Sequence, residues 1–219
     1  MRYLSVTLVL LLASLASADW SDNFDSYTAG SGINGQGNWF CWNGSTSAEA
    51  YVSTTQARSG ANSLDITPTS DVVQQVGVTS GTPVVSAWNY IPTGSTGKQY
   101  FILLTVYGGA SGNDWALNMR FDADSSLVNT VEGSASTAIV YDQWVEVKVE
   151  IDLAGDSQKI YYNGTLLDTV QWSPTSQVYQ LDAIDVFSDG GSSIYWDDFN
   201  LVGELALAPC TWASIKTSL

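Results

Sequence analysis

The chain has 219 residues, with 22 acidic and 7 basic side chains and a formal net charge of −15. Such an acidic surface repels polyphosphate, so neither nucleic acid nor an anionic membrane is an expected partner, whereas a neutral glycan meets no such barrier. The sequence contains no histidine, which excludes Ser-His-Asp and Cys-His mechanisms and the imidazole ligands usual for zinc and copper.

Residues 1–18 have the pattern of a secretory signal peptide. Arg2 precedes a mostly apolar run over residues 4–15, and Ala16-Ser17-Ala18 forms a small-residue cleavage site. The apolar run is too short to span a bilayer comfortably. We therefore expect an exported protein, secreted or held at the cell surface, whose mature chain begins at Asp19.

Residues 19–202 are expected to form one all-β domain, because turn signals recur roughly every 8–12 residues between short segments with strand character. In chain order, the predicted strands lie within residues 19–27, 51–52, 58–66, 72–78, 83–91, 99–107, 115–121, 128–132, 138–140, 145–152, 159–162, 165–167, 181–187 and 193–202. Residues 203–219 lack strand patterning, and we expect them to form a poorly ordered tail.

The clearest pattern lies within residues 144–167. Four aliphatic residues from Val145 to Ile151 alternate with charged residues, as in an antiparallel strand with one buried face. Asn163-Gly164 then provides the strongest short hairpin signal, because both residues tolerate the positive φ of a type I′ turn. Three consecutive strands joined by tight turns are predicted here.

This region also resembles a known superfamily. The strand at 144–152 and the hairpin at 161–167 are similar to the late strands of laminin-G-like and concanavalin A-like jelly rolls. Residues 194–201 are similar to the closing strand of many secreted carbohydrate-binding jelly rolls, and the resemblance extends over residues 24–201. It implies a two-sheet antiparallel β-sandwich of the concanavalin A-like type and a role in carbohydrate binding.

The resemblance further implies that the first and last strands are neighbours, which would bring acidic residues together. Asp22 and Asp25 lie in the first strand and Asp197 in the last, and carboxylates with backbone carbonyls form an oxygen cage suited to Ca²⁺. Strand parity turns Asp197 inward and Asp198 outward. We expect a structural calcium at Asp22, Asp25 and Asp197; the alternative is that Asp197 accepts backbone hydrogen bonds.

Aromatic residues are abundant, with nine Trp and eleven Tyr. A flat ring stacks on the apolar face of a sugar and buries a large area at low entropy cost. The tryptophans in or beside predicted loops are the candidate ligand-binding residues, with packing as the alternative for each: Trp39, Trp42, Trp115 and Trp172. Three others are expected in the core by strand position: Trp88, Trp144 and Trp196.

Glu150 and Asp152 are the candidates for a catalytic pair. They match the first half of the Glu-x-Asp-x-x-Glu motif of laminarinase-like enzymes, but Gly155 stands where the second Glu would fall. Their side chains lie on one face about 7 Å apart, within the range of about 6.5–9.5 Å found in inverting glycosidases. A charged outer face of an amphipathic strand explains them equally without catalysis.

Cys41 and Cys210 are the two cysteines, and in an exported protein they are candidates for a disulfide. The sequence leaves open whether they pair. The leading functional hypothesis is a secreted, non-catalytic, lectin-like module with a structural calcium that binds a neutral poly- or oligosaccharide. The alternatives are a glycoside hydrolase using Glu150 and Asp152, and a structural or adhesive extracellular protein.

Overall fold

The computed structural model describes residues 19–131 and 133–204, which are almost entirely strands and the turns that join them. Two short 3-10 turns, η1 (Trp42–Gly44) and η2 (Thr46–Ala48), are the helical elements in these ranges. No helix among these residues is long and apolar enough to cross a membrane. The predicted signal peptide and most of the predicted tail, with Cys210, lie outside the described residues.

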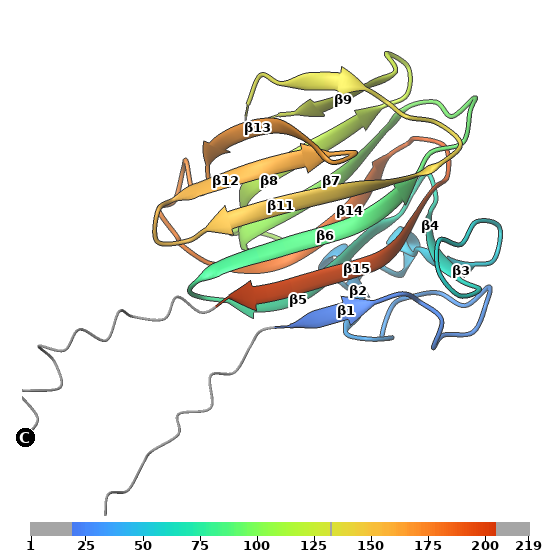
Figure 1. Ribbon diagram of the computed structural model, residues 1–219. Coiled ribbons are helices and arrows are strands. Elements are labelled where there is room, and N and C mark those ends of the chain that lie inside the picture. The colour runs from blue at the N-terminus through green and yellow to red at the C-terminus, as the bar shows by residue number, and fades with distance from the viewer. Residues whose placement is uncertain (1–18, 132, 205–219) are drawn as a thin grey trace, which may run out of the picture.

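The strands form two antiparallel sheets packed face to face (Figure 1), which confirms the predicted all-β sandwich. Sheet A has the order β13 (Thr165–Gln171), β12 (Ser157–Tyr162), β11 (Trp144–Asp152), β6 (Thr82–Tyr90), β15 (Ile194–Glu204), β4 (Ser63–Ile66) and β3 (Tyr51–Ser53), with β1 (Trp20–Asp22) paired to β15. Sheet B has the order β10 (Ser136–Ala138), β9 (Leu127–Thr130), β8 (Asp114–Asp122), β7 (Lys98–Val106), β14 (Leu181–Asp189), β5 (Asp71–Val78) and β2 (Trp39–Cys41).

The predicted alternation in residues 144–152 places one face of β11 in the core. The aliphatic residues from Val145 to Ile151 are at most 2% exposed, whereas the charged residues between them are half-buried on the outer face. Burying an aliphatic side chain of this size contributes about 1.5–3 kcal/mol. Asn163 and Gly164 have φ values of 51° and 71°, as the predicted type I′ turn between β12 and β13 requires.

Aromatic rings join the two sheets at the centre of the sandwich. The ring of Trp196 on β15 stacks on Phe101 of β7, with centroids 5.4 Å apart, and is fully buried, as predicted. The prediction that Trp88 and Trp144 are also core residues is wrong. Both lie on the outer face of sheet A because their neighbours, Ala87 and Val145, fill the inward positions.

Two β-bulges reverse the parity that simple alternation predicts. In β8, register shifts opposite Leu104 leave Ala116 and Leu117 both buried and turn Trp115 outward. In β15, one extra residue lies between Asp197 and Asn200 relative to β6. Because a bulge re-aims the side chains on one side of it, alternation assigns the faces correctly only on one side of each irregularity.

Candidate functional site

A hollow of about 270 Å³ lies on the outer face of sheet B, on the side opposite the sandwich core. This volume is slightly below the range of about 300–1,000 Å³ typical of small-molecule sites. Its lining is aromatic and polar: Trp42, Tyr100, Trp115 and Phe187, with Asp71, Asn118 and Asp185. We call this hollow the sheet B groove.

The floor of the sheet B groove is apolar because the central strands of sheet B are buried on both faces. Outside the main core, a second hydrophobic cluster forms around Val73, Ile102, Leu104 and Ala183. Tyr100 on β7 and Phe187 on β14 pack over this cluster, with ring centroids 5.6 Å apart and nearly parallel planes, an arrangement favourable for aromatic pairs. The floor is therefore a preformed, well-packed surface.

Trp115 reaches the groove through the bulge in β8. Alternation alone would place this indole in the core with Leu117 and Met119, whereas the register shift makes it 41% exposed on the groove side. An exposed tryptophan on a rigid strand holds its ring ready for a ligand with little loss of conformational entropy. The Trp115 ring is therefore accessible in the groove, and its role in ligand binding stays a prediction.

Trp42 lines the same hollow from η1, which follows β2 at the opposite edge of sheet B. Its ring packs edge-on against Tyr107, with centroids 4.9 Å apart. The Tyr107 hydroxyl accepts a hydrogen bond from the Asn43 backbone N–H (3.2 Å), and its backbone N–H donates to Asp182 (2.7 Å). Because η1 and the end of β7 hold each other in place, Trp42 is a fixed wall of the groove.

Two carboxyl groups stand among these rings. Asp185 on β14 is 2% exposed, and it is a diagonal neighbour of Asp71 on the adjacent strand β5. Burial raises the pKa of Asp185 well above its ordinary value, with the nearby Asp71 adding to the shift, and burial raises the pKa of Asp71 to about 6. The Oδ1 atom of each lacks a protein hydrogen-bond partner.

Trp39 and Trp172 are core residues, which corrects the expectation that they lie in an open ligand site. They are 1% and 0% exposed. The Trp39 indole N–H donates to Asp22 (3.0 Å), and that of Trp172 donates to the Gln180 carbonyl (3.1 Å). Each indole satisfies its one polar group inside the protein, so no ring face is presented to a ligand.

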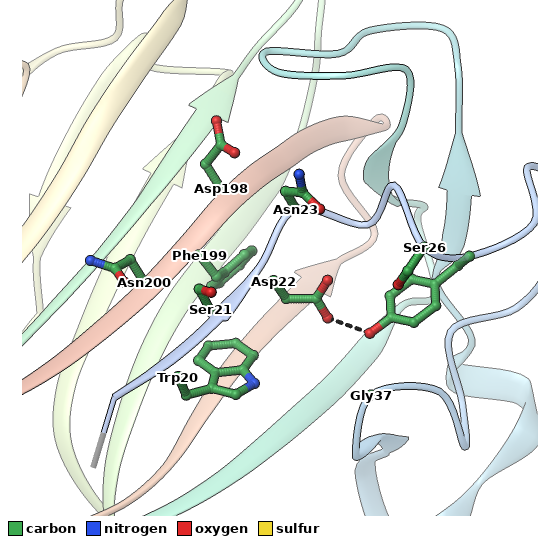
Figure 2. Close-up of a pocket in the computed structure, with 10 residues that line it drawn as sticks. Trp20, Ser21, Asp22, Asn23, Ser26, Gly37, Asp198, Phe199 and Asn200 are labelled. Atoms are coloured by element: carbon green, nitrogen blue, oxygen red, sulfur yellow. Dashed lines mark hydrogen bonds between the residues drawn. The ribbon is translucent and has the colours of Figure 1, made fainter. Parts of the chain in front are cut away.

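The polar hollow between β1 and β15, of about 540 Å³, contains one of the three predicted calcium ligands. Asp22 accepts hydrogen bonds from the Tyr27 hydroxyl (2.6 Å), the Phe24 N–H (2.9 Å) and the Trp39 indole. Figure 2 shows its carboxylate turned toward the tyrosine ring and Asp198 extending from β15 in another direction. The oxygens of Asp22 are thus occupied by donors, which does not fit a cation ligand.

The other two predicted ligands are also occupied by protein donors. Asp25 accepts the backbone N–H groups of Ala61 (2.8 Å) and Asn62 (3.0 Å). Asp197 is fully buried and accepts the N–H groups of Arg58 (2.8 Å), Ser59 (3.2 Å) and Asp198 (2.7 Å). In the part of the chain that the structure describes, no three acidic or cysteine side chains are grouped to hold a metal ion.

The backbone-acceptor alternative therefore describes Asp197, and calcium binding stays a prediction. Burial raises the pKa of Asp197 to about 6, although its three backbone hydrogen bonds act in the opposite direction. Asp198, expected to point outward, is partly exposed and forms an ion pair with Arg58.

Glu150 and Asp152 lie on the outer face of sheet A, on the opposite side of the sandwich from the sheet B groove. Glu150 accepts hydrogen bonds from Lys148 (2.7 Å) and the Tyr161 hydroxyl (2.9 Å), and the Lys148 bond is the main reason that its pKa is lowered. Asp152 caps a turn by accepting the Gly155 N–H (2.8 Å). A general acid needs a raised pKa, so this pair has the features of a charged outer face.

Cys41 is fully buried at the end of β2, and burial raises the pKa of its thiol to about 11. Its predicted partner, Cys210, lies outside the described residues, so the disulfide stays a prediction.

No protein-family model matches the sequence, and no curated protein matches it. Among solved structures, the fold is similar to a sialidase (TM-score 0.58, 12% identity), with 87% of this chain covering 19% of that one. It is also similar to an endo-β-1,4-glucuronan lyase from the fungus Trichoderma reesei (TM-score 0.52, 12% identity), with 82% of this chain covering 96% of the lyase. A Trypanosoma rangeli sialidase matches with TM-score 0.52 and 10% identity, over 75% of this chain and 30% of the sialidase.

These likenesses support the β-sandwich fold. The chain spans less than a third of the length of either sialidase and nearly the full length of the lyase.

Sequence reasoning selected Trp42 and Trp115 but missed the other groove residues. Tyr100 and Phe187 lie in strongly apolar strands, where nothing in the local sequence separates an outward ring from a core ring. Asp71 and Asp185 are isolated acids more than one hundred positions apart in the chain. The one available signal was Asp185 among the apolar residues Ile184, Val186 and Phe187, because an aspartate is unfavourable at a buried position.

Proposed function

We propose that this protein is a secreted, concanavalin A-like carbohydrate-binding module that binds a saccharide in the sheet B groove without cleaving it. The observation that carries the proposal is that Trp42 and Trp115 line one hollow together with the stacked rings of Tyr100 and Phe187. Rings of this kind stack on the apolar faces of sugars.

The polar groups of the groove support the same assignment. Carbohydrate recognition combines an apolar surface with a few fixed acceptors and donors, and the side chains of Asp71, Asn118 and Asp185 line the groove beside its rings. The names of the similar structures, two sialidases and a glucuronan lyase, favour a saccharide as the ligand. The export signal expected in residues 1–18 would place the protein where glycans are abundant.

A non-catalytic role is favoured over glycoside hydrolysis. The candidates for hydrolysis, Glu150 and Asp152, lie on the other sheet, and the pKa of Glu150 is lowered where a general acid needs a raised one. The residues that match the laminarinase-like motif are therefore separate from the groove.

The test is retention on a panel of insoluble and immobilised polysaccharides, with the supernatant assayed for new reducing ends. We expect retention without new reducing ends, and we expect Trp115→Ala and Trp42→Ala each to weaken binding at least ten-fold, which is about 1.4 kcal/mol. The matched control is Tyr51→Ala, which removes a 43% exposed ring from β3 of sheet A.

Retention that is unchanged in both tryptophan variants would contradict binding in this groove. New reducing ends from the wild-type protein would favour an enzyme instead. Retention on no glycan would favour a structural or adhesive protein.

A further inference from the structure

The carboxyl pair in the sheet B groove is built into the centre of the sheet. Asp185 on β14 is opposite Val73 of β5, and Asp71 is opposite Phe187, so the two aspartates are diagonal neighbours on one face. Both line the groove, and Asp185 is almost fully buried. An ionised carboxyl group is costly at such a position, and burial accordingly raises the pKa of both aspartates.

The lining of the groove defines what a ligand must offer. Asp71 and Asp185 are the acidic side chains that line the hollow, and no lysine or arginine is among the lining residues. A ligand in the groove therefore meets carboxyl groups and no cation. Sugar hydroxyl groups can donate hydrogen bonds to a carboxyl oxygen, whereas a ligand carboxylate offers only acceptors and carries the same charge as an ionised aspartate.

We propose that Asp71 and Asp185 form the polar recognition element of the groove and select uncharged, hydroxyl-bearing sugar residues over uronic and other acidic sugars. This inference rests on the proposed function and specifies its ligand class. In this assignment the aromatic rings supply affinity for any sugar, and the carboxyl pair discriminates between neutral and acidic sugars. An acidic sugar is rejected because its carboxylate has the same charge as the pair and leaves the carboxyl acceptors unpaired.

The basic side chain across from Tyr100 lines a different hollow. Arg120 on β8 pairs with Tyr100 across the strands, but it lines a separate depression under the turn between β9 and β10. A groove that took acidic sugars would need such a cation beside its rings, and Arg120 is therefore the residue whose substitution separates the two ligand classes.

The test measures affinities of the full chain by titration calorimetry for matched pairs of oligosaccharides. Gluco-, galacto- and manno-oligosaccharides are compared with oligoglucuronate, oligogalacturonate and oligomannuronate of equal length. We expect at least one neutral member to bind at least ten-fold more tightly than its uronate counterpart. Asp71→Asn and Asp185→Asn should each weaken binding of the neutral oligosaccharide. Each should also reduce the ratio of neutral to uronate affinity at least five-fold.

Two controls separate recognition from misfolding. Asp189→Asn makes the same change at the exposed end of β14 and should leave both affinities unchanged. Each variant is accepted only with a wild-type far-ultraviolet circular dichroism spectrum, and Asp71→Asn tests the pair independently should Asp185→Asn fail to fold.

The outcomes distinguish this inference from the proposed function. Binding that falls in Trp115→Ala but is unchanged in Asp71→Asn and Asp185→Asn overturns the inference and leaves the groove as the binding site. The inference is also overturned if uronates bind as tightly as their neutral counterparts. Loss of that uronate binding in Arg120→Gln would show that Arg120 is the group that holds the acidic sugar. Binding of no oligosaccharide by the wild-type protein overturns both.

Discussion

Asp22 and Asp185 are both buried carboxyl groups, and they differ in the hydrogen-bonding capacity left to them. Asp22 is surrounded by the Tyr27 hydroxyl, the Trp39 indole and a backbone N–H. Asp185 has one like-charged partner and an Oδ1 atom without a donor. A carboxylate whose oxygens all accept hydrogen bonds stabilises the fold, whereas one with an unpaired buried oxygen costs stability in the absence of a ligand. Of the two residues, Asp185 is therefore the one that indicates a binding site.

The carboxyl pair predicts how stability depends on pH. An unfolded aspartate loses its proton near pH 3.9, whereas in the folded protein burial raises the pKa of Asp71 to about 6 and raises the pKa of Asp185 well above its ordinary value. Above about pH 4 the folded state therefore binds more protons than the unfolded state, and the free energy of unfolding falls as pH rises through 6. Urea denaturation should show about 2 kcal/mol more stability at pH 5 than at pH 8.

Asp71→Asn should flatten this pH dependence without abolishing it. Asp197, whose pKa is also raised to about 6 by burial, contributes a fall of the same sign. Stability that is constant or rises between pH 5 and pH 8 in the wild-type protein would contradict the raised pKa values of these buried carboxyl groups.

The Asp197 side chain has its own prediction, which concerns stability. Asp197→Ala leaves the N–H groups of Arg58, Ser59 and Asp198 without their acceptor, and each unsatisfied buried group costs about 1–3 kcal/mol. Summed over the three groups, we expect a loss of at least about 3 kcal/mol in urea denaturation. The adjacent Asp198→Ala removes a partly exposed ion pair and should cost less than about 1 kcal/mol; equal losses in the two variants would refute the assignment.

At the scale of elements, irregularities in strands position the groove. The bulge in β8 brings Trp115 out of the core, and the 3-10 turn after β2 carries Trp42 over the opposite edge of sheet B. Regular strands between them supply the floor through Tyr100 and Phe187. Bulges recur next to functional sites because they re-aim one side chain while the sheet stays intact.

The hairpin between β12 and β13 allows an independent test of local backbone physics. Gly164 has φ of 71°, and no atom lies within 4 Å of the Cβ that a side chain would add. Gly164→Ala should therefore destabilise the protein only through backbone strain, by about 1 kcal/mol. Thr165→Ala, an exposed position directly after the turn, is the control for which we expect a change within about 0.5 kcal/mol; equal stability of wild type and Gly164→Ala would contradict the type I′ geometry.

At the scale of the whole molecule, β1 pairs with β15 and so joins the two ends of the described chain. The expected calcium would lie at this junction and would stabilise the folded state by mass action, by about 2.7 kcal/mol at one hundred times its dissociation constant. Melting of initially metal-free protein in calcium and in chelator tests this prediction. Because Asp197 accepts three backbone hydrogen bonds, we expect Asp197→Ala to lower the melting temperature in chelator as well as in calcium, and a loss confined to calcium would contradict the backbone role.

The sequence by itself determined the all-β class, the core face of β11 and the turn between β12 and β13. These features depend on period-two alternation and on the positive φ of Asn163 and Gly164, which are local properties of the chain. It also pointed to Trp42 and Trp115, because loop-flanking aromatic residues are recognisable without knowing their neighbours.

Only the tertiary structure decided which tryptophans are accessible and which acids meet. Trp39 and Trp172 lie beside turns like Trp42, yet they are buried, because turns that fold back over the core cannot be told from open ones by local pattern. Asp71 and Asp185 are adjacent because β14 pairs with β5, a non-local contact that sequence spacing does not encode. A one-residue bulge, invisible to alternation, turned Trp115 from the core to the groove.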